Sequence, residues 1–333
     1  MRVMGFALLI LVFMGCASCG HPATGADAVD TAHLEKDLLH LETKIPLAAV
    51  SGRIDHMAYD PAGHRLFVAA LGNRTVEVVD LAAGTRLHSI TGLREPQGVA
   101  YLPALERLVV ADGGTGGCML YDGHSYAVLG RVALGDDADN VRSDSQKIYV
   151  GYGSGGIAVI DPAQMRKIGD LTLEGHPESF QLGDSGRVWV NVPDAGEIVV
   201  GDLATLNLRS EWRNHDASAN FPMALDRQHS QLVVAYRHPA QLRILDSRTG
   251  TVEASVGCVG DADDVFYDAA TGLVFVSGGD GYLDVFRGPT RVNHLPTQKG
   301  ARTSLWLPAE RKLVLAVPAR AGKPAALWIY GIT

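Results

Sequence analysis

Short runs of apolar residues, separated by turn-forming residues, cover most of the chain. The first clear set comprises Met57 to Asp60, Arg65 to Leu71, Thr75 to Leu81 and Thr85 to Ile90. β-branched and aromatic residues are frequent in these runs, and the third run alternates apolar with polar positions, as a half-buried strand does. Gly, Pro, Asn and Ala divide the runs. The pattern therefore predicts four short strands joined by tight turns.

This four-strand pattern occurs seven times. The six-residue segment that opens each copy begins at Asp55, Gln97, Asp139, Pro177, Phe221, Asp263 and Arg302. Successive segments are 42, 42, 38, 44, 42 and 39 residues apart. Four strands in about 41 residues are typical of one blade of a β-propeller. We therefore expect an all-β fold, a seven-bladed β-propeller with four-stranded blades.

The seventh repeat is one strand short. It contains the apolar runs Leu305 to Leu307, Lys312 to Val317 and Ala326 to Ile332. Upstream of the first repeat, Leu38 to Leu47 has strand character but no neighbouring partner. We expect this N-terminal strand to complete the last blade and close the ring, because an open array would leave unpaired strand edges. A single domain from residue 37 to 333 follows.

An aspartate ends the third strand of the first five repeats. These residues are Asp80, Asp122, Asp161, Asp202 and Asp246. An aspartate at such a place can accept hydrogen bonds from the backbone N–H groups of the following turn. We therefore interpret the five carboxylates as structural.

The repeats resemble a known family. Phrases such as Leu66-Phe67-Val68-Ala69, Ile148-Tyr149-Val150-Gly151 and Val76-Glu77-Val78-Val79-Asp80 look like the YVTN-type propellers of the YncE-like family, which are exported bacterial proteins. The resemblance covers Leu38 to Thr333. It implies the propeller fold, and it says little about activity, because such propellers serve as binding platforms, enzyme scaffolds and surface modules.

The first 19 residues have the character of a signal peptide. A short basic start at Arg2 precedes the apolar run Val3 to Met14, and small residues follow. The segment Leu11 to Cys16 resembles a lipobox, although Phe13 stands where that motif normally carries Leu. Cys16 would then be lipidated; ordinary signal-peptidase cleavage further on is the alternative. Residues 20–36 predict a flexible tether, and we expect a periplasmic protein or a membrane-anchored lipoprotein.

Charge and cysteine content narrow the choice of partners. The net charge of −8 and the pI near 5.8 argue against a nucleic-acid surface, which needs a basic footprint. Cys118 and Cys258 fall in the second and fifth repeats, on opposite sides of the predicted ring, so we expect two separate thiols. We also expect a monomer that touches the membrane through its lipid anchor alone.

The loops that lead into the innermost strands open onto one mouth of the central channel. In four of the seven repeats, the second position of the aligned six-residue segment, here called the metal-ligand column, carries a potential metal ligand. These residues are His56, Asn140, Glu178 and Asp264. Oxygen donors with one imidazole suit Ca²⁺, Mn²⁺ or Zn²⁺. The set is similar to that of gluconolactonase-type propellers, although those have six blades. Solvated polar residues, or hydrogen bonds between blades, explain the same column without an ion.

A second set at the same mouth favours a charged or polar ligand. The candidate ligand-binding residues are Arg53, Asp55, Gln97, Asp139, Arg142, Asn220, Arg237, Asp263 and Arg302. Arginine presents paired donors to carboxylate or phosphate groups, whereas salt bridges between blades account for the same residues without any ligand. No catalytic residue is predicted.

Two functions remain open at this point. The first is a non-catalytic binding or scaffold protein of the bacterial envelope, with a small molecule, ion or peptide at the channel mouth and an envelope protein as a further partner. The alternative is a metal-dependent hydrolase of the lactonase or esterase type, in which the ion would polarise a carbonyl group or activate water.

Overall fold

The computed structural model describes residues 35, 38–144, 146–153, 155–320 and 322–333, which belong to one compact unit, residues 32–333. The predicted signal peptide with Cys16, and the predicted tether except Glu35, lie outside the described residues. No helix among the described residues is long and apolar enough to cross a bilayer.

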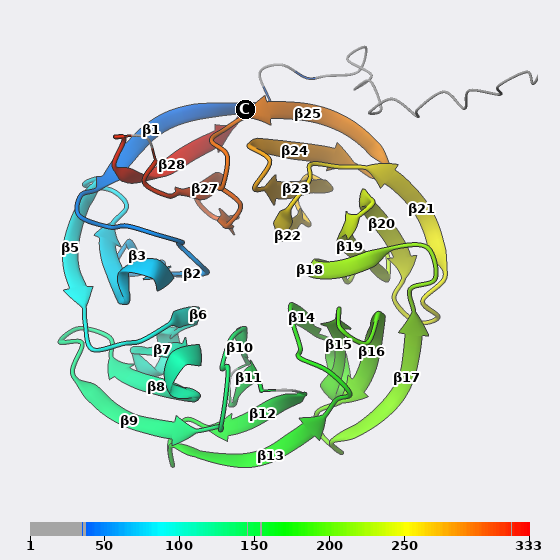
Figure 1. Ribbon diagram of the computed structural model, residues 1–333, viewed down its shortest axis with the longest axis horizontal. Coiled ribbons are helices and arrows are strands. Elements are labelled where there is room, and N and C mark those ends of the chain that lie inside the picture. The colour runs from blue at the N-terminus through cyan, green and yellow to red at the C-terminus, as the bar shows by residue number, and fades with distance from the viewer. Residues whose placement is uncertain (1–34, 36–37, 145, 154, 321) are drawn as a thin grey trace, which may run out of the picture. The chain divides into compact units, whose positions relative to one another are not determined.

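Seven four-stranded antiparallel sheets surround a central channel, as Figure 1 shows. Blades one to three contain β2 (Met57–Asp60), β3 (Arg65–Ala70), β4 (Thr75–Asp80), β5 (Thr85–Ile90); β6 (Pro96–Leu102), β7 (Arg107–Asp112), β8 (Gly117–Asp122), β9 (Val128–Ala133); and β10 (Val141–Ser143), β11 (Ile148–Tyr152), β12 (Gly156–Asp161), β13 (Arg166–Thr172). Blades four to six contain β14 (Phe180–Leu182), β15 (Arg187–Val192), β16 (Glu197–Asp202), β17 (Asn207–Arg213); β18 (Ser218–Asp226), β19 (Gln231–His238), β20 (Ala240–Asp246), β21 (Val252–Gly257); and β22 (Ala262–Asp268), β23 (Leu273–Gly278), β24 (Tyr282–Arg287), β25 (Thr290–Pro296). The seven-bladed propeller is therefore confirmed.

The seventh blade is built from both ends of the described chain. β26 (Ser304–Leu307), β27 (Lys312–Val317) and β28 (Ala325–Ile332) form three of its strands, and β1 (Leu39–Leu47) is the fourth. β1 runs antiparallel to β28, from the pair Leu39 and Ile332 to the pair Leu47 and Ala325. In Figure 1 the blue β1 lies along the red β28. The predicted closure of the ring by the N-terminal strand is thus confirmed.

Apolar faces of neighbouring blades form the core. β3 is buried along its whole length because sheets pack against both of its faces. Phe67 on β3 stacks on Tyr101 of the next blade with ring centroids 5.5 Å apart. At the closing blade, Ile45 and Leu47 are almost inaccessible and pack in one cluster with Leu66 of the first blade. Closure therefore buries apolar surface as well as pairing backbone groups.

The aspartates that end the third strands shape the turns that follow them. Oδ1 of Asp80 accepts hydrogen bonds from the backbone N–H groups of Ala82 and Ala83, at 2.9 and 2.8 Å. The same paired contacts occur at Asp122, Asp161, Asp202 and Asp246. Their structural role is confirmed. Cys118 and Cys258 are both free thiols, as predicted.

Candidate functional site

The central channel contains a cavity of about 440 Å³, lined by residues of the innermost strands of all seven blades. Val99, Val141, Met223 and Val265 contribute apolar wall. Polar lining comes from the loops that lead into the strands and from the first strand residues, namely His56, Arg142, Ser179, Asp264 and Ser304. The channel thus combines an apolar wall with a polar mouth.

Backbone hydrogen bonds fix the residues of the mouth before the innermost strand begins. The N–H of Asp55 donates to the carbonyl oxygen of Ala69 at 2.7 Å, and the N–H of Ala69 donates back to His56 at 3.0 Å. The corresponding pair in blade three joins Asp139 and Asn140 to Gly151, each at 2.9 Å. Because the second strand holds these positions, the side chains at the mouth project from a rigid frame.

One group of mouth residues joins the first and sixth blades. The carboxylate of Asp55 is 2.7 Å from Nη2 of Arg53 and 3.7 Å from Nε2 of His56. The other ring nitrogen of His56 is 3.8 Å from Oδ1 of Asp264. The backbone N–H of Ser304 donates to Oδ2 of Asp264 at 2.7 Å. The structure therefore brings together two of the four predicted metal ligands, His56 and Asp264.

Burial dominates the electrostatics of this group. It raises the pKa of Asp55 to about 6, although His56 and Arg53 oppose the shift. Burial, with a smaller contribution from Asp263, raises the pKa of Asp264 to about 7 against the opposing effect of His56. Burial lowers the pKa of His56, but its carboxylate neighbours outweigh that effect and raise it.

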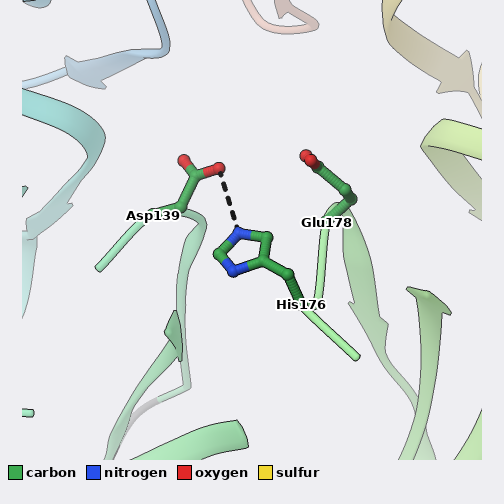
Figure 2. A group of neighbouring side chains, drawn as sticks. All are labelled: Asp139, His176 and Glu178. Atoms are coloured by element: carbon green, nitrogen blue, oxygen red, sulfur yellow. Dashed lines mark ion pairs between the residues drawn. The ribbon is translucent and has the colours of Figure 1, made fainter. Parts of the chain in front are cut away.

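A second group, shown in Figure 2, joins blades three and four. It consists of Asp139, His176 and Glu178, each of which places one potential ligand atom within 4.8 Å of those of the other two. Nε2 of His176 is 3.9 Å from Oδ2 of Asp139. Its Nδ1 is 2.6 Å from the carbonyl oxygen of Gly153, to which it donates a hydrogen bond. Glu178 comes from the same loop as His176, and Asp139 faces them from the preceding blade.

Opposing charges set the protonation of this second group. Burial and the nearby Asp139 raise the pKa of Glu178 to about 8. Burial lowers the pKa of His176, but Asp139 and the carbonyl of Gly153 raise it to about 9. Burial alone would raise the pKa of Asp139; the contacts with His176 and His56 lower it below its ordinary value.

The predicted arginines of blades five and seven form a third group with the aspartates of blade six. Nη2 of Arg237 donates to Oδ1 of Asp263 at 2.6 Å, and the guanidinium lies 3.9 Å from the ring centroid of Phe221. Nε of Arg302 is 3.2 Å from Oδ2 of Asp263, and Nη1 donates to Asp261 at 3.0 Å. Salt bridges between blades therefore account for Arg237, Asp263 and Arg302 as the structure stands.

The remaining predicted residues occupy different surroundings. Gln97 donates to Asp137 of the next blade at 3.0 Å. Arg142 lines the channel and lies 5.5 Å from the ring centroid of Phe180. Asn140 is 2% exposed, and its Oδ1 accepts no hydrogen bond from a described residue.

Asn220 is fully buried at the contact between blades four and five. Its Nδ2 donates to Oδ1 of Asn191 and to the carbonyl oxygen of Glu197, both at 3.0 Å. Its Oδ1 accepts from Asn214 at 3.1 Å. Because both the Nδ2 and the Oδ1 of Asn220 form hydrogen bonds with neighbouring residues, the side chain has a structural role in this structure.

His176 is the residue of the mouth that the sequence interpretation missed. It directly precedes the aligned six-residue segment, at a position where the other repeats have Ile54, Pro96, Ala138, Asn220, Ala262 and Ala301. A titratable side chain at an aligned position that is mainly apolar in the other repeats could have identified His176 as a candidate site residue. Pro177 takes the first aligned position, and His176 supplies the polar side chain beside it.

The fold and channel define a seven-bladed β-propeller with a polar channel mouth. No family model matches the chain, and no curated protein matches its sequence. Among solved structures it is similar to hydrazine synthase of Kuenenia stuttgartiensis, with a TM-score of 0.71 and 15% sequence identity. The match covers 83% of this chain and 94% of that chain. At this identity the likeness supports the fold and carries no conclusion about activity.

Proposed function

We propose that this protein is an exported, YncE-like binding protein of the bacterial envelope whose channel mouth receives a positively charged ligand. The signal-peptide pattern and the lipobox-like segment at Cys16 support export and anchoring. The repeats support the family, and the polar mouth supports a ligand-binding role. A small molecule or ion enters the channel from that mouth.

The observation that carries this proposal is a buried carboxylate, Asp55, whose closest charged partner is the partly exposed Arg53. Asp55 is 1% exposed, and neither of its carboxylate oxygens accepts a hydrogen bond from a described residue. Its nearest cation, Arg53, is 45% exposed and approaches one oxygen. Burying a carboxylate without hydrogen bonds is costly, and a cation compensates for that cost. A positively charged group entering the mouth therefore stabilises Asp55 and its neighbour Asp264.

The channel below the mouth favours an organic ligand. Its apolar wall, which includes Val99, Val141 and Met223, can contact a hydrocarbon body while Asp264, which also lines the cavity, contacts a cationic head. A volume of about 440 Å³ is within the usual range for small-molecule sites. A small amine with an apolar tail fits both parts.

Thermal unfolding in the presence of matched organic amines and carboxylic acids tests the proposal. A ligand present at a hundred times its Kd stabilises the folded state by about 2.7 kcal/mol. We expect amines to raise the Tm, Asp55→Asn and Asp264→Asn to weaken the effect, and Asp184→Asn, whose side chain is 93% exposed, to leave it unchanged. Stabilisation by acids alone, or by neither class, would overturn the proposal.

A metal-dependent lactonase or esterase is the second candidate. It is favoured by the Asp139, His176 and Glu178 group, since three protein ligands leave coordination positions open for water. Hydrolysis of a panel of lactones and esters, measured with added Zn²⁺ or Mn²⁺ and again with a chelator, tests this candidate. Metal-dependent turnover that Glu178→Gln abolishes would establish it over simple binding.

A further inference from the structure

We infer that Asp139, His176 and Glu178 form a binding site for one divalent transition-metal ion, Zn²⁺ or Mn²⁺. The inference rests on the proposed function in one respect, namely that the channel mouth is where a cation binds. It adds the identity of an inorganic ion and a set of three ligands, of which His176 and Asp139 lie outside the predicted metal-ligand column.

The spacing of the ligand atoms fits an ion better than direct contacts. The gap of 3.9 Å between Nε2 of His176 and Oδ2 of Asp139 is too long for a hydrogen bond. Two metal–ligand bonds of about 2.1 Å together span up to about 4.2 Å, so one ion can bridge these two atoms. A ligand oxygen of Glu178 lies within 4.8 Å of both atoms, close enough for the inference to include it as the third ligand.

The histidine is oriented as metal-binding histidines usually are. Its Nδ1–H donates to the carbonyl oxygen of Gly153 at 2.6 Å, which directs Nε2 towards Asp139. A backbone carbonyl that holds one ring nitrogen in this way fixes the ring and presents the other nitrogen to the metal. The ion takes the place of any proton on Nε2, which passes to solvent, and no electron is transferred.

A buried oxygen without a partner gives independent support. Asp139 is 7% exposed, and its Oδ1 accepts no hydrogen bond from a described residue. Asn140, next in sequence, also keeps its Oδ1 buried without a donor. Native proteins seldom leave buried oxygens without a partner, so we expect a hydrogen-bond donor or a cation to bind next to Oδ1 of Asp139. An ion bound by both carboxylate oxygens of Asp139 would also satisfy Oδ1.

The ligand types select among divalent ions. One imidazole with two carboxylates suits Zn²⁺ and Mn²⁺, whereas Ca²⁺ prefers six to eight oxygen ligands. With three protein ligands, the ion keeps coordination positions open for water or for a further ligand.

Isothermal titration of the chelator-treated full-length protein with ZnCl₂, MnCl₂ and CaCl₂ tests the site. We expect one Zn²⁺ or Mn²⁺ per chain, bound more tightly than Ca²⁺. Glu178→Gln, which preserves the shape of the side chain, and His176→Ala should each lower that affinity at least tenfold. His124 and Glu106 are an exposed pair 3.4 Å apart, so His124→Ala and Glu106→Gln are the matched controls and should have no effect.

Three results would overturn the inference: no stoichiometric Zn²⁺ or Mn²⁺, tighter binding of Ca²⁺ than of either, or unchanged affinity in Glu178→Gln. If amines stabilise the protein and no metal binds, the metal site is wrong and the proposed function stands. If neither amines nor metals bind, both are wrong. Visible absorption of the Co²⁺-loaded protein checks coordination directly, because the spectrum of bound Co²⁺ differs from that of the hydrated ion.

Discussion

The hydroxyl group of Thr303 donates a hydrogen bond to the carbonyl oxygen of Ile54, 3.1 Å away, across 249 positions of sequence. Thr303 belongs to the seventh blade and Ile54 precedes the first, so the bond crosses the junction at which the ring closes. β1 joins the same junction from the outer side through its pairing with β28. The contacts of this junction lead to the first prediction.

Substitution of Leu47 by Ala should lower the free energy of unfolding by about 2–5 kcal/mol, because the side chain is fully buried and leaves a cavity. Leu41 lies on the same strand with 42% exposure, so Leu41→Ala is the control and should change stability by less than about 0.5 kcal/mol. Urea unfolding followed by circular dichroism measures both. Equal losses of stability in the two variants would show that the buried side chain of Leu47 contributes little to the core.

Removal of residues up to Leu47 should destabilise the whole domain.

Asn220→Ala should lower the free energy of unfolding by about 1–3 kcal/mol, because Asn191 and Asn214 lose their buried partner. Asn207 begins the outer strand β17 and is exposed, so Asn207→Ala is the control. If Asn220→Ala leaves stability unchanged and abolishes ligand binding, the residue is a ligand contact rather than part of the scaffold.

Stability should fall as the pH rises through the range in which Asp264 ionises. Its pKa in the folded state is raised to about 7, chiefly by burial, whereas an unfolded aspartate titrates near 3.9. The stabilising contribution of the protonated form is complete below about pH 4 and is lost as the pH approaches and passes 7. Asp264→Asn does not titrate, and its amide oxygen can still accept from Ser304.

Urea unfolding at pH 5 and pH 8 measures this effect. The variant should gain relative to the parent protein at pH 8, by up to about 4 kcal/mol for a shift of three units. Asp184→Asn, with its exposed side chain, should show the same pH dependence as the parent protein. A difference between Asp264→Asn and the parent protein that is constant with pH would contradict the prediction.

Gly98→Ala should both destabilise the protein and weaken metal binding. A Cβ atom at Gly98 would lie 2.1 Å from the carbonyl oxygen of Asp139, a backbone atom that cannot rotate away. Overpacking of this kind costs about 1–3 kcal/mol and displaces the Asp139 ligand. At Gly130 a Cβ would meet the flexible side chain of Met165 at 3.0 Å, so Gly130→Ala should be tolerated better. Thermal unfolding and Zn²⁺ titration of both variants provide the measurement.

The fold was predictable from the sequence because the same four-strand pattern occurs seven times, so each copy supports the strand positions assigned in the others. The strand predicted from Arg65 to Leu71 ends one residue earlier, at Ala70, because Leu71–Asn73 form a 3-10 turn. The seventh repeat holds three predicted strands, which pointed to β1 as its fourth; the predicted start of β1 at Leu38 is one residue early. Local hydrophobic patterns suffice for such assignments, since each strand pairs with its neighbours in sequence or closes the ring.

The contacts within the mouth were less predictable. Sequence alignment indicates which positions face the channel, but not which side chains meet. His56 in blade one approaches Asp264 in blade six, although blade seven separates the two blades along the ring. Glu178 lies instead with Asp139 and His176. The predicted four-residue metal column stays a prediction, whereas the three-residue group depends on how blades three and four are placed.

The pairing of β1 with β28 also bears on the order in which the protein can fold. Among the strands of the described residues, β1 is synthesised first and its partner β28 last, with Leu39 opposite Ile332. A chain that emerges from its N-terminus cannot close the ring until the final strand is present. Any product that stops short of β28 keeps two unpaired strand edges, which favour aggregation and proteolysis. Closure of the ring therefore depends on synthesis of the chain as far as β28.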